Sequence, residues 1–212
     1  KNSDSFSFLP SFAELYVTQH EICQCFVANI NVSCVATGVR SPYLTCDRLL
    51  SNKMLLIVTW VIAINALCGN AFVFVWRKKN PQRNRIQDLL LTNLAISDAI
   101  MGIYMLIITG ADVYFGEHFP MQSENWRSGI TCRIAGALSI IASEGSVFFV
   151  TIISIDRCIN MKFPYSTNKL GKTSVFVSCV VVWIISVVLG VLPSIFSGFN
   201  FKFYDNSHVC IG

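Results

Sequence analysis

Charged residues are scarce in this chain, and their scarcity is the first constraint on the class of protein. Asp, Glu, Lys and Arg together make up 13% of the 212 residues, whereas soluble domains contain roughly 25%. Hydrophobic residues make up 53% of the sequence. A soluble protein reaches such a composition only when its apolar runs are short, and here they are long. The composition therefore excludes an ordinary soluble domain.

The chain also lacks the signatures of catalysis, transport and targeting. No nucleophile–base pair and no metal-ligand set stands out, so we expect neither an enzyme nor an organic cofactor. The helices show no internal repeat of the kind that many transporters contain. No signal peptide opens the sequence, which begins at Lys1 among polar residues. We therefore expect a piece processed or excised from a longer protein.

Four apolar runs of membrane-spanning length are present instead. Residues 54–76 and 174–201 contain no charge, and residues 89–111 and 134–155 contain one acid each, Asp98 and Glu144. A helix that crosses a bilayer needs about 20 such residues, and a helix satisfies its backbone polar groups internally. The sequence predicts an all-α membrane protein with helices at about 53–76, 86–114, 131–158 and 173–197.

Basic residues are concentrated beside these runs. The segment 77–85, RKKNPQRNR, is densely basic, and the loop 156–172 contains four basic residues against one acid, Asp156. The positive-inside rule places both in the cytoplasm. We expect a multi-pass plasma-membrane protein whose N-terminus and loop 112–131 lie outside. Nucleic-acid binding by the basic run is the alternative, but its position against a membrane span favours a topology anchor.

The nine cysteines divide between the two sides of this topology. Cys68, Cys158 and Cys179 fall in helices or at the cytosolic edge. Six fall outside, an even number that suits disulfides in an oxidising compartment: Cys23, Cys25, Cys34, Cys46, Cys132 and Cys210. A zinc site at the first two is less consistent, because one residue separates them and no histidine pattern follows. The sequence alone does not determine the pairing.

Residues 1–51 form an outer, cysteine-bearing segment before the membrane domain at 52–212. Asn31 begins a glycosylation sequon within it. Ser11 and Glu14 have the spacing of a capping box. Leu15 and Tyr16 follow at helical spacing, so we expect a short amphipathic helix in this segment.

Asp98 is an acid near the middle of a membrane helix, where a carboxylate costs about 2.5–3.5 kcal/mol. It should therefore face the interior of the bundle and find polar partners. Asn70 of the first helix offers an amide, and Ser146 of the third offers a hydroxyl. Together the three side chains could hold water or a small cation such as sodium through oxygen ligands. The alternative is a polar contact that only packs the helices.

The third helix carries two further polar features. Glu144 lies nearer its outer half and points in a different direction from Ser146; it either senses a ligand or makes a structural hydrogen bond between helices. Asp156 and Arg157 stand where the helix meets the cytosol. Asp156 can hold Arg157 in an ion pair until a docking helix competes for the guanidinium donors. The alternative for Arg157 is an ordinary positive-inside arginine.

Taken jointly, these residues resemble the rhodopsin-like (class A) G protein-coupled receptors. Each motif is short, but the order and spacing are specific across about 140 residues. The motifs are Gly69-Asn70, Asn93-Leu94-Ala95 with Asp98, Cys132, Ser146, Asp156-Arg157, Pro164, Trp183, Pro193 and Cys210. The strings MGIYMLII and ASEGSV, the Trp126 before Cys132, and the hinge strings ICQCF and YLTCDRLL look like the leucine-rich-repeat branch. KFPYS is closer to relaxin-type and related invertebrate orphan receptors than to glycoprotein-hormone receptors.

The resemblance implies four of the seven helices of a class A bundle, preceded by a cysteine-rich extracellular hinge. Such a receptor transmits the binding of an extracellular peptide or protein hormone to a heterotrimeric G protein. Arg157 would engage the G protein, with Asp156 as its switch partner, and Asp98, Asn70 and Ser146 would contribute to a sodium site. Cys132 and Cys210 would form the outer disulfide, and the hinge cysteines would bridge the ectodomain to the bundle.

The sequence departs from the family pattern in three ways. Cys158 stands where Tyr usually follows the Asp-Arg pair, and the second helix lacks the proline often found beyond its acid. Helices five to seven and any leucine-rich repeat are missing, so this chain alone should not signal. The alternatives are a four-helix scaffold of the tetraspanin or claudin kind, or an ion path through Asp98 and Glu144. The outer cysteines mostly precede the first helix, which argues against the scaffold.

Overall fold

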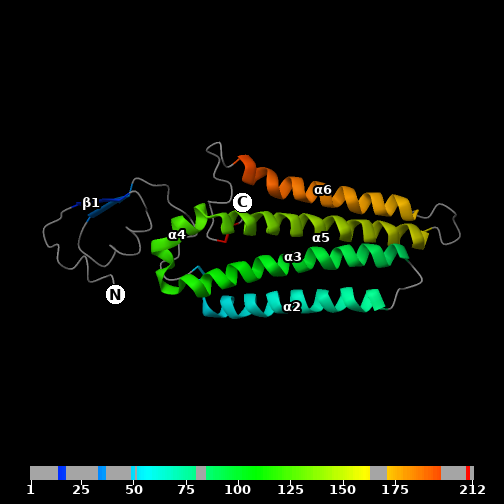
Figure 1. The fold of residues 1–212 in the computed structure, drawn as a ribbon, viewed down its shortest axis with the longest axis horizontal. Helices are drawn as coiled ribbons and strands as arrows, with labels where there is room; N and C mark the ends of the chain where they lie inside the picture. Colours follow the sequence, from blue (N-terminus) through cyan, green and yellow to red (C-terminus); the bar gives the residue numbers. More distant parts are fainter. Residues whose placement is uncertain are drawn as a thin grey trace.

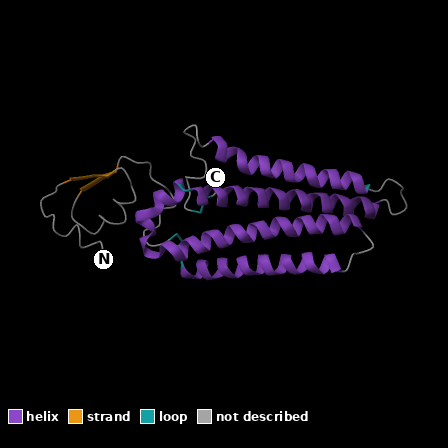
Figure 2. Ribbon diagram, viewed as in Figure 1, coloured by secondary structure: helices purple, strands orange, loops and turns teal. Residues whose placement is uncertain are grey.

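The computed structural model describes residues 14–17, 33–36, 49–50, 52–79, 85–162, 171–196 and 209–210. Four long helices lie alongside one another in this part of the chain (Figures 1 and 2). They are α2 (Lys53–Lys79), α3 (Arg85–Phe115), α5 (Ile130–Lys162) and α6 (Lys172–Phe196). All four are long and apolar enough to cross a membrane. The all-α membrane fold expected from the hydropathy is confirmed.

The observed helices are close to the predicted ones. α2 and α5 continue three and four residues past their predicted ends, to Lys79 and Lys162. Pro193 lies inside α6, which runs on to Phe196. A proline in a membrane helix is tolerated where neighbouring groups satisfy the freed backbone carbonyl.

A short 3-10 turn (Gly116–His118) and the helix α4 (Phe119–Ser128) connect α3 to α5. The sequence predicts part of an outer loop here, so this helix was not expected. α4 is polar on average, so a hydropathy scan does not detect it. Its local signals are a proline in the first turn and the buried residues Phe119, Ser123 and Trp126 at helical spacing.

The outer segment contains two short strands, β1 (Glu14–Val17) and β2 (Ser33–Ala36), which pair in parallel with Glu14 opposite Ser33. The amphipathic helix expected around Leu15 and Tyr16 is therefore wrong. Tyr and Val favour strands, and the partner strand lies outside any local window. Cys34 belongs to β2, whereas Cys23, Cys25, Cys46 and the sequon at Asn31 lie outside the described residues.

Small residues set the spacing between the helices. A Cβ added to Gly102 of α3 would come within 2.9 Å of Leu67 in α2. A Cβ added to Gly190 of α6 would come within 2.7 Å of Ile141 and 2.8 Å of the Ala137 carbonyl in α5. Lipid is as apolar as the helix surfaces, so close backbone approach stabilises such contacts. Large apolar side chains cover the outward surfaces of α2 and α6.

Candidate functional site

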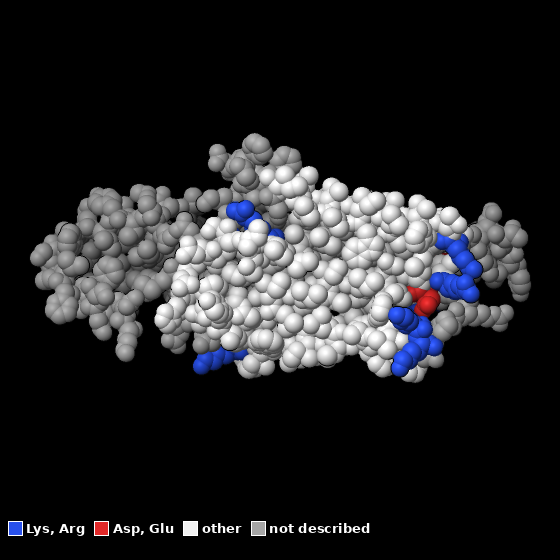
Figure 3. Space-filling view, in the orientation of Figure 1, with Lys and Arg blue, Asp and Glu red and all other residues white. Residues whose placement is uncertain are grey.

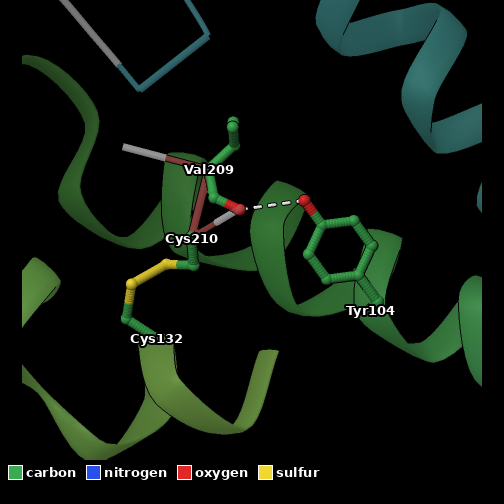
Figure 4. The surroundings of a disulfide bond; sticks show 4 residues. All are labelled: Tyr104, Cys132, Val209 and Cys210. Atoms are coloured by element: carbon green, nitrogen blue, oxygen red, sulfur yellow. Dashed lines mark hydrogen bonds between the residues drawn. A yellow bond between two sulfur atoms is a disulfide. The ribbon is translucent and has the colours of Figure 1, made fainter. Parts of the chain in front are cut away.

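One end of the bundle, here called the disulfide end, is held together by a covalent bond between α5 and the segment after α6. Cys132 and Cys210 form a disulfide with a Cα–Cα distance of 5.3 Å, and both are fully buried. Beside it, the Tyr104 hydroxyl of α3 donates a hydrogen bond of 2.9 Å to the carbonyl of Val209 (Figure 4). The segment that reaches Cys210 is thus anchored to two helices.

Asp112, near the end of α3, receives the segment that precedes α2. Its Oδ1 accepts a hydrogen bond of 2.8 Å from the backbone N–H of Leu50. Its Oδ2 is buried without a hydrogen-bond partner among the described residues. The sequence predicts Asp112 at the start of an outer loop and indicates no role for it. Only the three-dimensional contact with Leu50 identifies it.

These groups belong to one apolar cluster at the disulfide end. Its members come from α3, α4, α5 and both flanking segments: Leu49, Tyr104, Ile108, Ala111, Phe119, Trp126, Cys132, Ala135 and Cys210. The segments before α2 and after α6 therefore pack against the same buried surface. A displacement of one changes the packing that holds the other.

A groove opens beside this cluster, between α3, α4 and the start of α5. Its volume is about 370 Å³. The side chains around it are apolar or uncharged: Ile107, Gly110, Ala111, Tyr114, Phe115, Asn125, Trp126, Gly129 and Thr131. Phe115 contacts Trp126 edge-to-face, with ring centroids 5.7 Å apart. We refer to this feature as the α3–α4 groove.

The middle of the bundle contains a polar contact between α3 and α5. The Ser146 hydroxyl donates a hydrogen bond of 2.7 Å to Oδ1 of Asp98. One turn away, the Ser97 hydroxyl donates to the Ala142 carbonyl at 2.9 Å. Asn70 does not join them, because its amide donates to the Ala66 carbonyl of its own helix at 2.7 Å. Two of the three residues expected to form a polar centre are thus brought together.

A sodium ion would find a carboxylate and a hydroxyl oxygen at Asp98 and Ser146. Hard cations prefer such oxygen ligands. Within the described residues, no group of three or more His, Cys, Asp or Glu side chains could hold a metal. The two oxygens fit part of a coordination shell. Water or other protein groups would have to supply the rest.

Glu144 lies on the side of α5 that meets α6. Three residues before it, Ile141 faces Gly190 of α6. Four residues after it, Phe148 packs against a buried cluster formed by α3, α5 and α6. Residues with this spacing share one helix face. Glu144 is half-buried, and the structure records no hydrogen bond or ion pair for it among the described residues. Its direction differs from that of Ser146, which faces α3.

A third link joins α6 directly to α3. The indole N–H of Trp183 donates a hydrogen bond of 2.9 Å to Oδ1 of Asn93. The Trp183 ring packs on Phe149 of α5, with centroids 5.7 Å apart. Phe149 is fully buried. Three helices therefore meet at one indole.

The opposite end of the bundle, here called the basic end, gathers Lys and Arg side chains (Figure 3). Asp156 is buried there, with 5% of its surface exposed, while Arg157 is exposed. The two form no ion pair, contrary to the interaction considered from the sequence, because adjacent residues point to different sides of a helix. Instead Arg77 of α2 pairs with Asp88 of α3 at 2.9 Å, a link that the sequence analysis did not identify.

The arrangement defines a multi-pass helical membrane protein with a disulfide at one end and a buried acid beside an exposed arginine at the other. The sequence profile of the family described as "7 transmembrane receptor (rhodopsin family)" matches residues 69–212. The chain belongs to this family of receptors. The match favours the receptor over the scaffold and ion-path alternatives.

Known proteins similar to this chain are receptors as well. The G-protein coupled receptor GRL101 of Lymnaea stagnalis is 34% identical over 206 residues, which are 97% of this chain and 18% of that protein. The thyrotropin receptor of Felis catus is 29% identical, covering 85% of this chain and 25% of the receptor. Relaxin receptor 2 of Canis lupus familiaris is 24% identical, covering 99% of this chain and 28% of the receptor.

These relatives agree with the leucine-rich-repeat branch of class A receptors. The identities do not separate the relaxin-type from the thyrotropin receptors. The chain spans less than a third of the length of each relative.

Proposed function

We propose that the protein containing this chain binds an extracellular peptide or protein hormone and transmits that event to a heterotrimeric G protein. The observation that carries the proposal is the pair Asp156 and Arg157 at the basic end of a bundle matched to the rhodopsin family. Arg157 is exposed, and a guanidinium offers a rigid fork of donors suited to the carbonyls of a docking helix. Asp156 is buried directly beside it in the chain.

The orientation in the membrane follows from the charges. The basic end carries Arg77, Lys78 and Lys79 in the last turn of α2, and Lys162 in the last turn of α5. An excess of Lys and Arg marks the cytoplasmic side. The disulfide end, with residues 1–51, is then extracellular. An oxidising compartment at that end agrees with the disulfide.

The hormone class is proposed from two observations. Receptors for thyrotropin and relaxin are among the similar proteins, and the segment before α2 is hydrogen-bonded into the bundle at Asp112. An event in the outer segment would reach α3 through that contact. In this proposal, the hinge cysteines Cys23, Cys25, Cys34 and Cys46 bridge the ectodomain to the bundle. For Glu144 both alternatives stay open: it contacts a ligand, or it makes a structural hydrogen bond between helices.

The test replaces Arg157 by Ala in the complete receptor and measures G-protein activation in membranes. We expect activation to fall by at least about tenfold, since the proposed contact to the G protein is lost. Lys78→Ala is the matched control, because Lys78 is an exposed cation at the same end and should leave coupling unchanged. Cell-surface labelling confirms that both variants reach the plasma membrane. Undiminished coupling in Arg157→Ala at equal surface expression would overturn the role of Arg157.

A further inference from the structure

The hydroxyl of Ser186 in α6 is buried inside the bundle without a hydrogen bond to the protein. The residue is fully buried, and its Oγ has no partner among the described residues. Serine and threonine hydroxyls in helices often donate to the carbonyl four residues earlier, as those of Ser143, Thr151 and Ser178 do. The Ser186 hydroxyl does not. A buried hydroxyl without a hydrogen bond is energetically unfavourable, so a further polar partner for it is expected.

The Ser186 hydroxyl lies close to a bare stretch of backbone in α5. A Cβ added to Gly145 of α5 would lie 3.9 Å from the Ser186 Oγ and 2.6 Å from the Ser97 Oγ of α3. The two hydroxyls therefore approach Gly145 from two different helices. Their oxygens are about 6.5 Å apart at most, the sum of those two distances, and they do not bond to each other.

A direct link between α3 and α6 at the neighbouring turn explains why the two hydroxyls lie at the same height. Trp183, three residues before Ser186, donates its indole N–H to Asn93, four residues before Ser97. Residues with these spacings share one side of a helix. Ser186 therefore faces α3 one turn beyond the bond between Trp183 and Asn93.

The groups around this point are polar but uncharged. The Ser97 hydroxyl donates to the Ala142 carbonyl of α5 at 2.9 Å, and both oxygens keep lone pairs that can accept a further hydrogen bond. Asp98 is the next residue along α3, but its Oδ1 accepts a hydrogen bond from Ser146, and adjacent residues point to different sides of a helix. A neutral molecule that both donates and accepts hydrogen bonds suits these groups better than a cation does.

We propose that one buried water molecule bridges the hydroxyls of Ser186 and Ser97 beside Gly145. A water that bonds to both oxygens at about 2.8 Å spans a separation of roughly 4–5.5 Å, which is within the limit set by the contacts at Gly145. It accepts a hydrogen bond from Ser186 and donates one to Ser97, and its second hydrogen is available to the Ala142 carbonyl. Buried waters make about three such bonds. The water joins α6 to α3 and α5, one turn away from the Trp183 indole.

The first test is the melting temperature of Ser186→Ala in the detergent-solubilised complete receptor. We expect a fall of roughly 2–4 °C, since a hydrogen-bonded link between helices is lost. A hydroxyl without any partner predicts the opposite sign, because its removal relieves the cost of burying it. Ser178→Ala is the matched control on the same helix: Ser178 is only partly buried, its hydroxyl bonds to the Ser174 carbonyl, and its loss should change the melting temperature by about 1 °C or less. An unchanged or raised melting temperature in Ser186→Ala would overturn the proposal.

A second test separates a bridging water from a hydrogen bond within α6. Ser97→Ala and Ser186→Ala each break the same bridge, so their combined effect on the melting temperature should be smaller than the sum of the single effects. Ser97→Ala combined with Ser178→Ala should be additive. A density map of the complete receptor at about 2 Å resolution should show one water within about 3.2 Å of both hydroxyl oxygens. The proposal fails if the first pair is additive, or if the map shows Ser186 donating to the Val182 carbonyl with no water beside it.

Discussion

Asp112 of α3 accepts a hydrogen bond of 2.8 Å from the backbone N–H of Leu50, although 62 residues separate them in the sequence. Asp112 is fully buried, and so is most of Leu50. A hydrogen bond to a carboxylate is roughly twice as strong as one between neutral groups. The segment that enters α2 is therefore fixed to α3 at one specific residue.

Replacing Asp112 by Ala should destabilise the receptor by about 1–3 kcal/mol, because the buried N–H of Leu50 loses its acceptor. Leu50→Pro removes the donor of the same bond and should have an effect of similar size. The double variant should be less destabilised than the two single effects added together, since both remove one interaction. The measurement is the melting temperature of the detergent-solubilised receptor. Strict additivity would show that the bond contributes nothing to stability.

Replacing Gly190 by Ala should force α5 and α6 apart. The new methyl group would lie 2.8 Å from the backbone carbonyl of Ala137, and a backbone atom cannot rotate away. We expect a loss of about 1–3 kcal/mol, typical of overpacking. Gly69→Ala has open space around its Cβ and should be neutral or slightly stabilising, because alanine favours a helix over glycine. A melting curve for each variant distinguishes the two, and equal curves would refute the close approach.

Removing the disulfide should loosen the disulfide end. Cys132→Ser and Cys210→Ser should each cost about 2–4 kcal/mol, the usual effect of losing one such cross-link. Cys158→Ser is the control, because Cys158 is exposed and not bridged. The readouts are the melting temperature and the amount of receptor at the cell surface. An effect of Cys158→Ser as large as that of Cys132→Ser would contradict the prediction.

If Asp98 and Ser146 hold a sodium ion, sodium chloride should raise the melting temperature more than choline chloride at the same ionic strength. Asp98→Asn should abolish the difference between the salts, and Ser146→Ala should reduce it, since each removes an oxygen ligand. Thr151→Ala is the control, because among the described residues the Thr151 hydroxyl bonds to the Val147 carbonyl of its own helix. Identical melting curves in the two salts for the unmodified receptor would refute the sodium site. The contact between Asp98 and Ser146 would then serve helix packing alone.

The sequence predicted those features that depend on composition or on short-range pattern. The four membrane helices follow from uninterrupted apolar runs, which no other class of element accommodates in lipid. The pairing of Asp98 with Ser146 follows from the cost of an unpartnered acid in the bilayer. α4 was missed because it is short and polar, and the stability of such a helix comes from the tertiary burial of Phe119 and Trp126.

Features that depend on distant contacts could not be read from the sequence. Asn70 has a nearby carbonyl, that of Ala66, and bonds to it instead of to Asp98. Nothing local distinguishes Asp112 from an exposed loop acid, because its burial is created by Leu50 and the packed segments around it. The strand at Glu14–Val17 likewise depends on a partner 19 residues away in sequence.

The attachment of α2 has a mechanical consequence. α2 and the residue Leu50 before it contact α3 at three heights: Leu50 at Asp112, Leu67 at Gly102, and Arg77 at Asp88. Contacts at both ends and in the middle should oppose sliding of α2 along α3, so we expect the two helices to move together. We therefore expect a pull on the chain before α2 to act on α3, which is hydrogen-bonded through side chains to both α5 and α6. Such a pull should then reach the basic end through both α5 and α6.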